Sequence, residues 1–352
     1  MNNLSLSFLL LIFISAGVLT WLAGIALTKT TDSLDCRFKI GDAFGGLILL
    51  GVAGSLPEIA VVFSAAVHGH IPVIIGNLLG GIAIQTLIIV IFDFAIKGKR
   101  PLSYLAGSIT LFFETIFAIF MLALAILGTY VPAKDSIFHM NPFSIVILFA
   151  WFIGLYLVDK SHKVKRFNQV EDDANPGRLH DECRVSEKSS FFINKSNLHV
   201  IFVFLFASII TLIAGVLLEE SGTAMAMSLG INSGIFAATI LALVTSLPEI
   251  STGIEAIFIG DNHLALSDIW GGNAFMLVPF FVTDLIAKKP ILSYAQNTDR
   301  IFSFLGIGMM SIYAIAFLVK LKRRYFRLGL DSIFEIILYA AGIMLLFYLK
   351  LI

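Results

Sequence analysis

The sequence predicts an all-α polytopic membrane protein, with about ten transmembrane helices in two inverted five-helix repeats. Composition, run length and internal repetition carry this prediction. Hydrophobic residues make up 58% of the 352 residues and charged residues 14%, whereas soluble proteins carry about 25% charged residues. The apolar runs approach the length of about 20 residues that a membrane-spanning helix needs. They lack the period-two alternation of an outer-membrane barrel, so we expect helices.

The apolar runs also predict the domain organisation. A hydrophilic stretch at 159–196, dense in charges of both signs, separates the first five runs from the last five. We therefore expect a first five-span repeat at 1–158, a linker at 159–196 and a second five-span repeat at 197–352. The first run is interpreted as a span, because it lacks the basic region and cleavage site of a signal peptide. The predicted spans are 4–27, 41–67, 71–96, 102–128, 141–158, 197–218, 231–259, 263–287, 301–319 and 330–351.

The second half repeats the first at an offset of 191 residues, without gaps over more than seventy positions, and the matches just beyond are shifted by one or two residues. The string Ser-Leu-Pro-Glu-Ile at 55–59 recurs at 246–250. Chance similarity explains scattered apolar matches, but not a string that contains Pro and Glu. Because five spans is an odd number, the second repeat starts from the opposite side of the membrane, and the repeats are inverted. Other matching pairs are Thr20 and Thr211, Gly24 and Gly215, Gly80 and Gly271, and Asp93 and Asp284.

The distribution of basic residues predicts the orientation. Cytoplasmic loops carry the excess of Lys and Arg. With ten spans, 19 of the 24 Lys and Arg residues fall on the side opposite the amino terminus, and the linker carries eight of them. We therefore expect an integral multi-pass protein with a cytoplasmic linker and with both termini outside.

Two carboxylates, Glu58 and Glu249, lie well inside apolar runs. Such a charge costs about 2.5–3.5 kcal/mol unless it faces a partner or a cavity. Each follows a proline, which removes a backbone hydrogen bond and kinks the helix. The hydroxyls of Ser55, Thr245 and Ser246 lie in the same turns, and these oxygens suit a hard cation such as sodium or calcium. The alternative is a tolerated kink whose glutamate sits in a buried ion pair, but the neighbouring spans contain no Lys or Arg.

The third and eighth runs are expected to supply facing helices. Their glycines, at 76, 80, 81, 271 and 272, allow close helix approach. Asn77 and Gln85 share one face at helical spacing, and Asp268 lies on the corresponding face of the second repeat. Asp268 is eight residues from Met276, about 12 Å along a helix, so we expect it either in the site or at its entrance. Met276 offers only a soft thioether, so the two halves are chemically unequal.

Several other titratable residues are expected to lie outside the site. His68 and His70 flank a short turn, where solvated loop histidines are the simpler interpretation than metal capture or pH sensing. Glu255 is expected at a wet vestibule position. Three carboxylates near span ends are expected to reach the interface: Asp93, Asp284 and Glu335.

The two motifs, Gly51 to Glu58 and Val244 to Glu249, each followed by a Gly-Gly helix, resemble the two repeats of the sodium/calcium exchanger family in the cation/calcium antiporter superfamily. The resemblance implies a ten-span antiporter that exchanges calcium for sodium or protons by alternating access. It implies that Glu58 and Glu249 are central cation ligands, with the three hydroxyl residues as their neighbours. The sequence departs from the family pattern at Gly54, Gly81 and Met276, while Gln85 is similar to an amide of the proton-coupled branch.

The functional prediction is a secondary cation antiporter, with inorganic cations and the lipid bilayer as partners. No nucleic acid and no cofactor other than the transported ions are expected, and protein partners are left open. The alternative is a transport-inactive, membrane-embedded cation-binding or regulatory protein of the same fold. The sequence contains no P-loop string. An intramembrane hydrolase ranks last because its motifs do not occur, so an enzyme is not expected.

Overall fold

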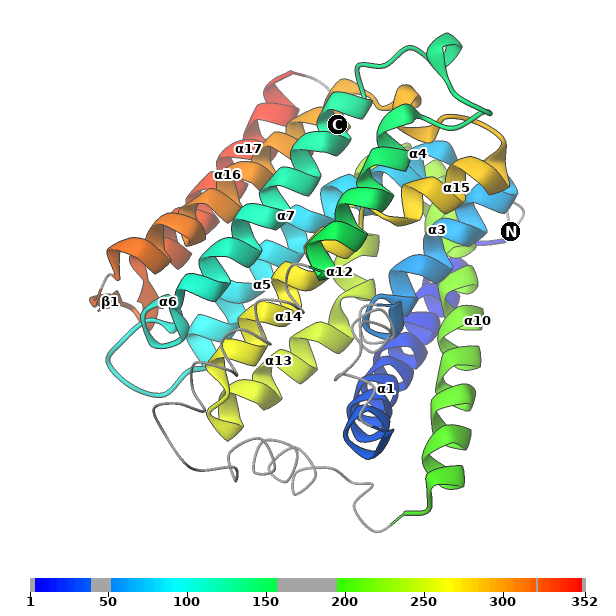
Figure 1. Cartoon of the computed structure of the whole chain (residues 1–352). Coiled ribbons are helices and arrows are strands. Elements are labelled where there is room, and N and C mark those ends of the chain that lie inside the picture. Colours follow the sequence, from blue (N-terminus) through cyan, green and yellow to red (C-terminus); the bar gives the residue numbers. More distant parts are fainter. Residues whose placement is uncertain (1–3, 39–51, 157–194, 321, 350–352) are drawn as a thin grey trace.

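The computed structural model describes residues 4–38, 52–156, 195–320 and 322–349, and its described elements are almost all helical (Figure 1). The predicted linker at 159–196 lies almost wholly outside the described residues. The helices of the first repeat are α1 (Leu6–Phe38), α3 (Leu56–His68), α4 (Ile71–Ile75), the π-helix η2 (Gly76–Gly80), α5 (Gly81–Ala95), α6 (Leu102–Ala106), α7 (Ile109–Gly128), the short 3-10 turn η3 (Ala133–Asp135) and an apolar helix, Pro142–Tyr156.

The second repeat has the same order of long elements and adds a short hairpin of two antiparallel strands before its last helix. Its elements are α10 (Asn197–Leu229), α11 (Ser233–Phe236), the π-helix η4 (Ala237–Leu241), α12 (Ala242–Thr245), α13 (Leu247–Ile259), α14 (Asn262–Phe275), α15 (Pro279–Ala287), the 3-10 turn η5 (Ile291–Tyr294), α16 (Asn297–Val319), β1 (Arg324–Tyr325), β2 (Leu328–Gly329) and α17 (Leu330–Tyr348).

The helices confirm the internal repeat and its offset. Shifted by 191 residues, the bounds of α1 coincide with those of α10, and the bounds of α3 coincide with those of α13. Both α3 and α13 end at a glycine in the left-handed conformation, Gly69 and Gly260, where a residue without a Cβ is favoured. Sequence positions related by the offset therefore occupy equivalent places in the fold.

The inversion of the repeats is visible in the longest helix pair. α1 and α10 lie side by side (Figure 1). The end of α1 meets the start of α10, where Leu34 packs on Val200, and Leu27 packs on Ala207 further along. The two equivalent helices therefore run antiparallel, as inverted repeats require.

The predicted number of ten spans is not confirmed as a count. Among the described residues, seven helices are long and apolar enough to cross a membrane, or eight when the bent pair Ser233–Thr245 and Leu247–Ile259 counts as one span. Leu56–His68 and Pro142–Tyr156 are shorter apolar helices, and part of the predicted second span, 41–67, lies outside the described residues.

The first and sixth helices extend beyond the predicted spans. α1 continues to Phe38 and α10 to Leu229, beyond the expected ends at 27 and 218. The polar residues that end each apolar run stay helical because their side chains find partners. Thr30 donates to the Ala26 carbonyl, and Glu219 is buried in contact with groups from the first repeat.

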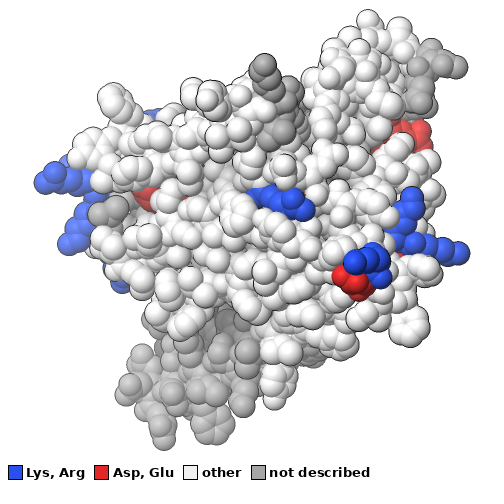
Figure 2. Space-filling model, turned by 90° about the horizontal axis from the view of Figure 1, so that it is seen from above, with Lys and Arg blue, Asp and Glu red and all other residues white. Residues whose placement is uncertain are grey.

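The outer surface is largely uncharged, as a lipid-facing surface should be. Charged side chains occupy only a few places on the face shown in Figure 2. Large apolar side chains lie exposed on the helices that surround the fold, among them Leu22, Phe113, Phe149 and Phe202. In water such an apolar surface would be a liability, so this observation supports the membrane assignment.

Each long helix packs on the Leu-Pro-Glu helix of the opposite repeat. Gly24 of α1 lies against the ring of Pro248 in α13, and the equivalent Gly215 of α10 lies against Ala60 in α3. A Cβ at either glycine would overlap those atoms. The two glycines therefore let the long helices approach the segments that carry Glu58 and Glu249.

We expect alanine at Gly24 or Gly215 to destabilise the fold, by about 1–3 kcal/mol, because overpacking forces neighbouring helices apart. Gly271→Ala is the matched control, since no atom lies within 4 Å of a Cβ built there. It should be neutral or stabilising, because alanine favours a helix over glycine by about 1 kcal/mol. Thermal unfolding of purified protein in detergent measures all three variants. Equal effects at Gly215 and Gly271 would contradict the close packing.

Candidate cation site at the two helix breaks

Two helix breaks place a carboxylate at equivalent points of the two repeats. In α3 and α13 the first three residues are Leu, Pro and Glu, so Glu58 and Glu249 both lie in the first helical turn. α13 bends by 44° from the preceding helical segment. The proline has no N–H to continue the earlier helix, and a helix N-terminus favours a negative charge. The predicted kinks are therefore present as true helix starts.

The hydroxyls before Glu249 are turned toward the main chain. Thr245 Oγ1 and Ser246 Oγ both donate to the Ala242 carbonyl, at 3.1 and 2.9 Å. Because each hydroxyl uses its hydrogen in this bond, its lone pairs remain available to a cation. Thr245, Ser246 and the equivalent Ser55 are all buried.

The structure brings acidic groups of both repeats together. The Thr245 hydroxyl faces Glu58 across the repeat boundary. The negative charges of Glu58 and Asp268 both act on Glu249. Both carboxylate oxygens of Glu58 and one of Glu249 are buried without a hydrogen-bond partner among the described residues. Buried polar atoms are rarely left unpaired, so these oxygens are available for a ligand.

The amide side chains of the third and eighth predicted spans are buried and keep oxygens without a partner among the described residues. Gln85 is buried with its Oε1 unpaired, next to Gly272 on α14. Asn77 is fully buried on η2, and neither of its amide atoms has a partner among the described residues. Asn273 donates to Thr86 at 3.3 Å and keeps its own oxygen unpaired.

The acidic groups alone do not form a closed cage. Within the described part of the chain, no three His, Cys, Asp or Glu side chains come together in a way that could hold a metal ion. A cation at the breaks therefore draws on hydroxyl and amide oxygens as well as on carboxylates. Calcium accepts such mixed oxygen sets readily.

Equivalent positions of the two repeats differ in exposure. Glu58 is 1% exposed, while Glu249 is half-buried. Asn77 is buried, while its equivalent Asp268 is exposed. Gly80 is buried and its equivalent Gly271 is exposed. At these three positions the second repeat is therefore more exposed than the first.

Two of the sequence departures fit one another in space. A Cβ at Gly81 would lie 2.9 Å from the terminal methyl of Met276. The first repeat thus lacks a side chain where the second repeat supplies a long one. Close approach through glycine is confirmed at Gly76 and Gly80, which lie against Gly234 and Ala238. The prediction of close helix approach was wrong at Gly271, where a Cβ would meet no atom, and at Gly272, where it would meet only Gln85 Oε1.

We expect Gly81→Ser to destabilise the protein because the new side chain collides with Met276. Met276→Ala removes the colliding methyl, so the double variant should recover at least half of the loss. Thermal unfolding of the single and double variants gives the coupling energy, which for residues in contact is about 0.5–3 kcal/mol. Strictly additive effects would contradict the paired fit.

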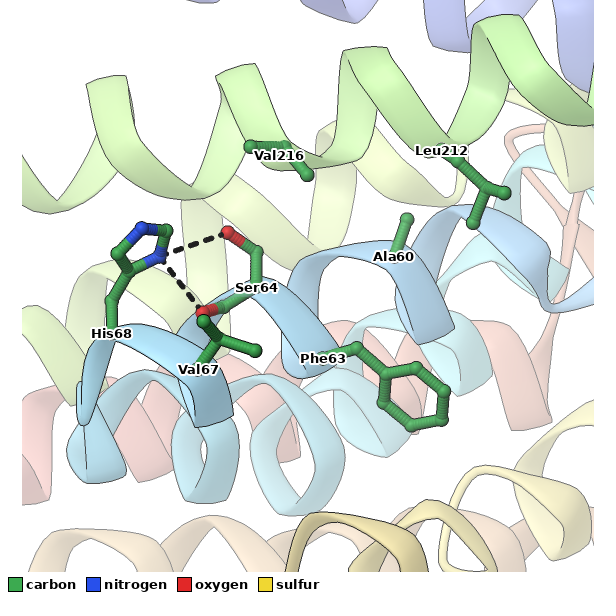
Figure 3. A pocket seen from close by; sticks show the side chains of 7 residues that line it. All are labelled: Ala60, Phe63, Ser64, Val67, His68, Leu212 and Val216. Carbon is green, nitrogen blue, oxygen red and sulfur yellow. Dashed lines mark hydrogen bonds between the residues drawn. The ribbon is translucent and has the colours of Figure 1, made fainter. Parts of the chain in front are cut away.

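His68 is exposed, as expected, and His70 is half-buried, but both also contact a buried glutamate of the other repeat. His70 Nδ1 lies 2.6 Å from Glu219 Oε1, and Ser64 Oγ donates to Glu219 Oε2 at 2.8 Å. His68 lies 3.6 Å from Glu219 and lines a shallow apolar groove between α3 and α10 (Figure 3). Glu219 was missed because its helix was predicted to end one residue earlier.

An equivalent tie joins the other long helix to the opposite repeat. Lys29 of α1 pairs with Glu255 of α13 at 2.9 Å, with both side chains partly exposed. At the offset of 191, Lys29 corresponds to Glu220 and Glu255 corresponds to Ser64. The fold therefore holds each long helix against the opposite Leu-Pro-Glu helix by polar contacts at mirrored positions.

A sequence model of the family described as sodium/calcium exchanger protein matches residues 8–158 and 199–351. The chain belongs to this family. In this sodium/calcium exchanger family protein, both helix breaks lie inside the matched segments. Members of the family are transporters, so the expectations of an exchanger fold and of a non-enzyme are confirmed.

The exchanger chain is similar to a bacterial relative and to solved exchangers. It is 26% identical over 295 residues to the inner membrane protein YrbG of Escherichia coli (strain K12), covering 83% of this chain and 82% of that protein. The crystal structure of the H+/Ca2+ exchanger CAX matches with TM-score 0.64 and 15% identity, covering 97% of this chain and 88% of that one. The sodium-calcium exchanger NCX_Mj matches with TM-score 0.57 and 18% identity, covering 97% and 99%. These two likenesses show the fold.

Proposed function

We propose that this protein is a secondary antiporter that binds a divalent cation, calcium, between Glu58 and Glu249 and exchanges it for sodium or protons. The observation that carries the proposal is the mirrored pair of helix breaks, which hold a buried carboxylate, Glu58, and a half-buried one, Glu249. No lysine or arginine among the described residues forms an ion pair with either glutamate. Two uncompensated carboxylates in an apolar setting attract a cation, because leaving them ionised and alone is costly.

The chemistry of the surrounding oxygens supports a hard cation and an exchange reaction. Ser55, Thr245 and Ser246 add hydroxyl oxygens, Gln85 and Asn77 add amide oxygens, and the carboxylates add charge. Calcium takes six to eight such oxygens at about 2.3–2.6 Å. Sodium ions or protons neutralise the same carboxylates, so occupancy by one ion excludes the other. This competition is what couples two opposite fluxes.

The unequal exposure of the repeats supports alternating access. An inverted pair of repeats can exchange roles, so that the closed half opens while the open half closes. The half-buried Glu249 and exposed Asp268 describe a state open on one side, and the buried Glu58 and Asn77 describe the closed side. The mirrored state would expose the Glu58 side.

Uptake of calcium-45 by proteoliposomes tests the proposal. The protein is reconstituted, and uptake is followed under an outward sodium gradient, under a proton gradient and without a gradient. We expect uptake under at least one gradient, and its collapse when an ionophore dissipates that gradient. Folded protein that gives no uptake under either gradient would favour the transport-inactive binding or regulatory protein. Met276, whose thioether stands where an oxygen ligand would otherwise be expected, is the residue that points to this alternative.

The orientation is part of the proposal and has a direct test. The excess of Lys and Arg on one side supports a cytoplasmic linker at 159–196, with both termini outside. Cys183 lies in this linker, and Cys36 is the only other cysteine. In a Cys36→Ser variant, a membrane-impermeant thiol reagent should label Cys183 only after the membrane is permeabilised. Labelling of Cys183 in intact cells would show that the linker lies outside, which is the opposite orientation.

A further inference from the structure

A second group of buried carboxyls lies far from the helix breaks, where α5, α6, α16 and α17 meet the strand hairpin. It contains Asp93, Asp331 and Glu335, together with the hydroxyls of Ser103 and Tyr313, and each residue is at most 2% exposed. Asp93 and Glu335, like Asp284, were predicted to reach the interface, and this expectation was wrong because all three are buried. The electrostatic effects of Glu335, Asp331 and Asp93 all converge on the Tyr313 hydroxyl, so these groups form one cluster.

One part of the cluster is architectural. Asp93 accepts hydrogen bonds from the backbone N–H of Leu102 at 2.7 Å, from that of Gly329 at 2.5 Å and from Ser332 Oγ at 2.9 Å. It thereby joins three segments. The equivalent Asp284 accepts from the N–H groups of Ile291 and Asn141, at 2.7 and 2.8 Å. Because both repeats have this arrangement, the role of Asp93 is to hold neighbouring segments together.

Glu335, Asp331 and Tyr313 are not accounted for in this way. The N–H of Asn141 binds Asp284 as that of Gly329 binds Asp93, an offset of 188 residues in this part of the chain. Asp331 and Glu335 therefore correspond to Phe143 and Ile147, and Tyr313 corresponds to an apolar residue at either offset, Leu122 or Ala125. The first repeat thus builds the same junction without any of them. Several of their buried oxygens have no hydrogen-bond partner among the described residues: both carboxylate oxygens of Glu335, Asp331 Oδ1 and Tyr313 Oη.

Arg324 lies beside this cluster, and its guanidinium is hydrogen-bonded to main-chain oxygens. Its guanidinium donates to the carbonyls of Asp93, Ile96 and Gly98. The titratable groups that face Glu335 are therefore Asp331 on its own helix, Tyr313 on α16 and Asp93 on α5. All of these are neutral or negative. An ionised Glu335 would be a buried charge without a hydrogen-bond donor among the described residues and close to a second carboxylate, Asp331, which is unfavourable.

We propose that this cluster is a proton-binding site, in which Glu335 holds the proton among Asp331, Tyr313 and Asp93 and so keeps α17 packed on α16 and α5. The bound proton removes one negative charge and turns a lone carboxylate into an O–H donor for its neighbours. A metal ion is disfavoured, because no three acidic or His side chains of the described residues are arranged to hold one. As pH rises and the proton leaves, the buried charge should loosen α17. The site does not rest on the transport proposal.

Two measurements on purified full-length protein test the site without using transport. Infrared difference spectra between acidic and alkaline pH should show a protonated carboxyl C=O band that is absent in Glu335→Gln. When the pH is raised, the thermal midpoint of the wild type should fall by more than that of Glu335→Gln, by a difference of a few degrees. Glu114→Gln is a carboxyl control and should keep both wild-type responses.

Asp331→Asn is the second variant, used if Glu335→Gln fails to fold. It should retain the carboxyl band, but the band should titrate at a more acidic pH than in the wild type. The reason is that removing a negative neighbour makes the ionised form of Glu335 less unfavourable. Wild-type behaviour of Glu335→Gln in both measurements would overturn the proposal. So would stabilisation at alkaline pH by added sodium or calcium that depends on Glu335, since this result would assign the cluster to a metal cation.

Discussion

Replacing Glu58 by glutamine is expected to abolish calcium exchange, and Glu249→Gln is expected to do the same. Each substitution keeps the shape of the side chain and removes one negative charge from beside the bound cation. At about 4 Å and an effective dielectric constant of about 20, a single pair of unit charges contributes about 4 kcal/mol. Such a loss corresponds to about a thousandfold in affinity. Calcium-45 uptake into proteoliposomes measures the effect.

Glu114→Gln is the matched control for these two variants, because Glu114 lies in α7 rather than at either helix break. It should leave uptake close to the wild-type rate. The thermal midpoints of all three variants establish that they are folded. Uptake by folded Glu58→Gln at the wild-type rate would contradict the assignment of the first break as half of the site.

Cross-linking α1 to α12 is expected to stop exchange. α1 covers the second helix break, with Gly24 on Pro248 and Gly17 beside Val244. Closing the entrance at Asp268 and opening the Glu58 side requires these contacts to change. A Cβ at Gly17 would lie 2.9 Å from Val244 Cγ1, which suits a disulfide between cysteines at these two positions. In a background without Cys36 and Cys183, oxidation should abolish uptake and a reductant should restore it.

A second cysteine pair controls for cross-linking itself. Leu27 and Ala207 join α1 to α10 in one apolar cluster, and these two helices share the most extensive helix contact in the fold. If they move as one unit, a disulfide at this pair should leave uptake largely intact. Full activity of the oxidised Gly17→Cys/Val244→Cys protein, with the bond confirmed by mass spectrometry, would rule out movement of α1 against α12.

The repeats and the helix breaks could be predicted from the sequence because their causes are local. Proline at 57 and 248 interrupts the hydrogen-bonded helix wherever it occurs. The offset of 191 residues can be found without structural information, and it predicts that α3 and α13 have equivalent bounds. The pairing of Glu58 with Thr245 follows from inversion only in outline, since it also needs the relative placement of the two repeats.

The features that were missed depend on partners distant in sequence. In the sequence, Glu219 directly follows an apolar run. In the fold it is buried, with His70 and Ser64 of the other repeat in contact with it. Glu335 lies close to a span end and therefore suggested an interface position, but α5 and α16 cover it. The fit between Gly81 and Met276 was hidden for the same reason, since each residue alone departs from the family pattern.

Equilibrium binding of calcium-45 to the purified protein tests the central claim most directly, namely that one cation is held jointly by the two repeats. The account predicts one calcium per molecule in the wild type and loss of this binding in Glu58→Gln and in Glu249→Gln alike. Retention of one bound calcium at wild-type affinity by either folded variant would contradict it, because the site would then belong to a single repeat.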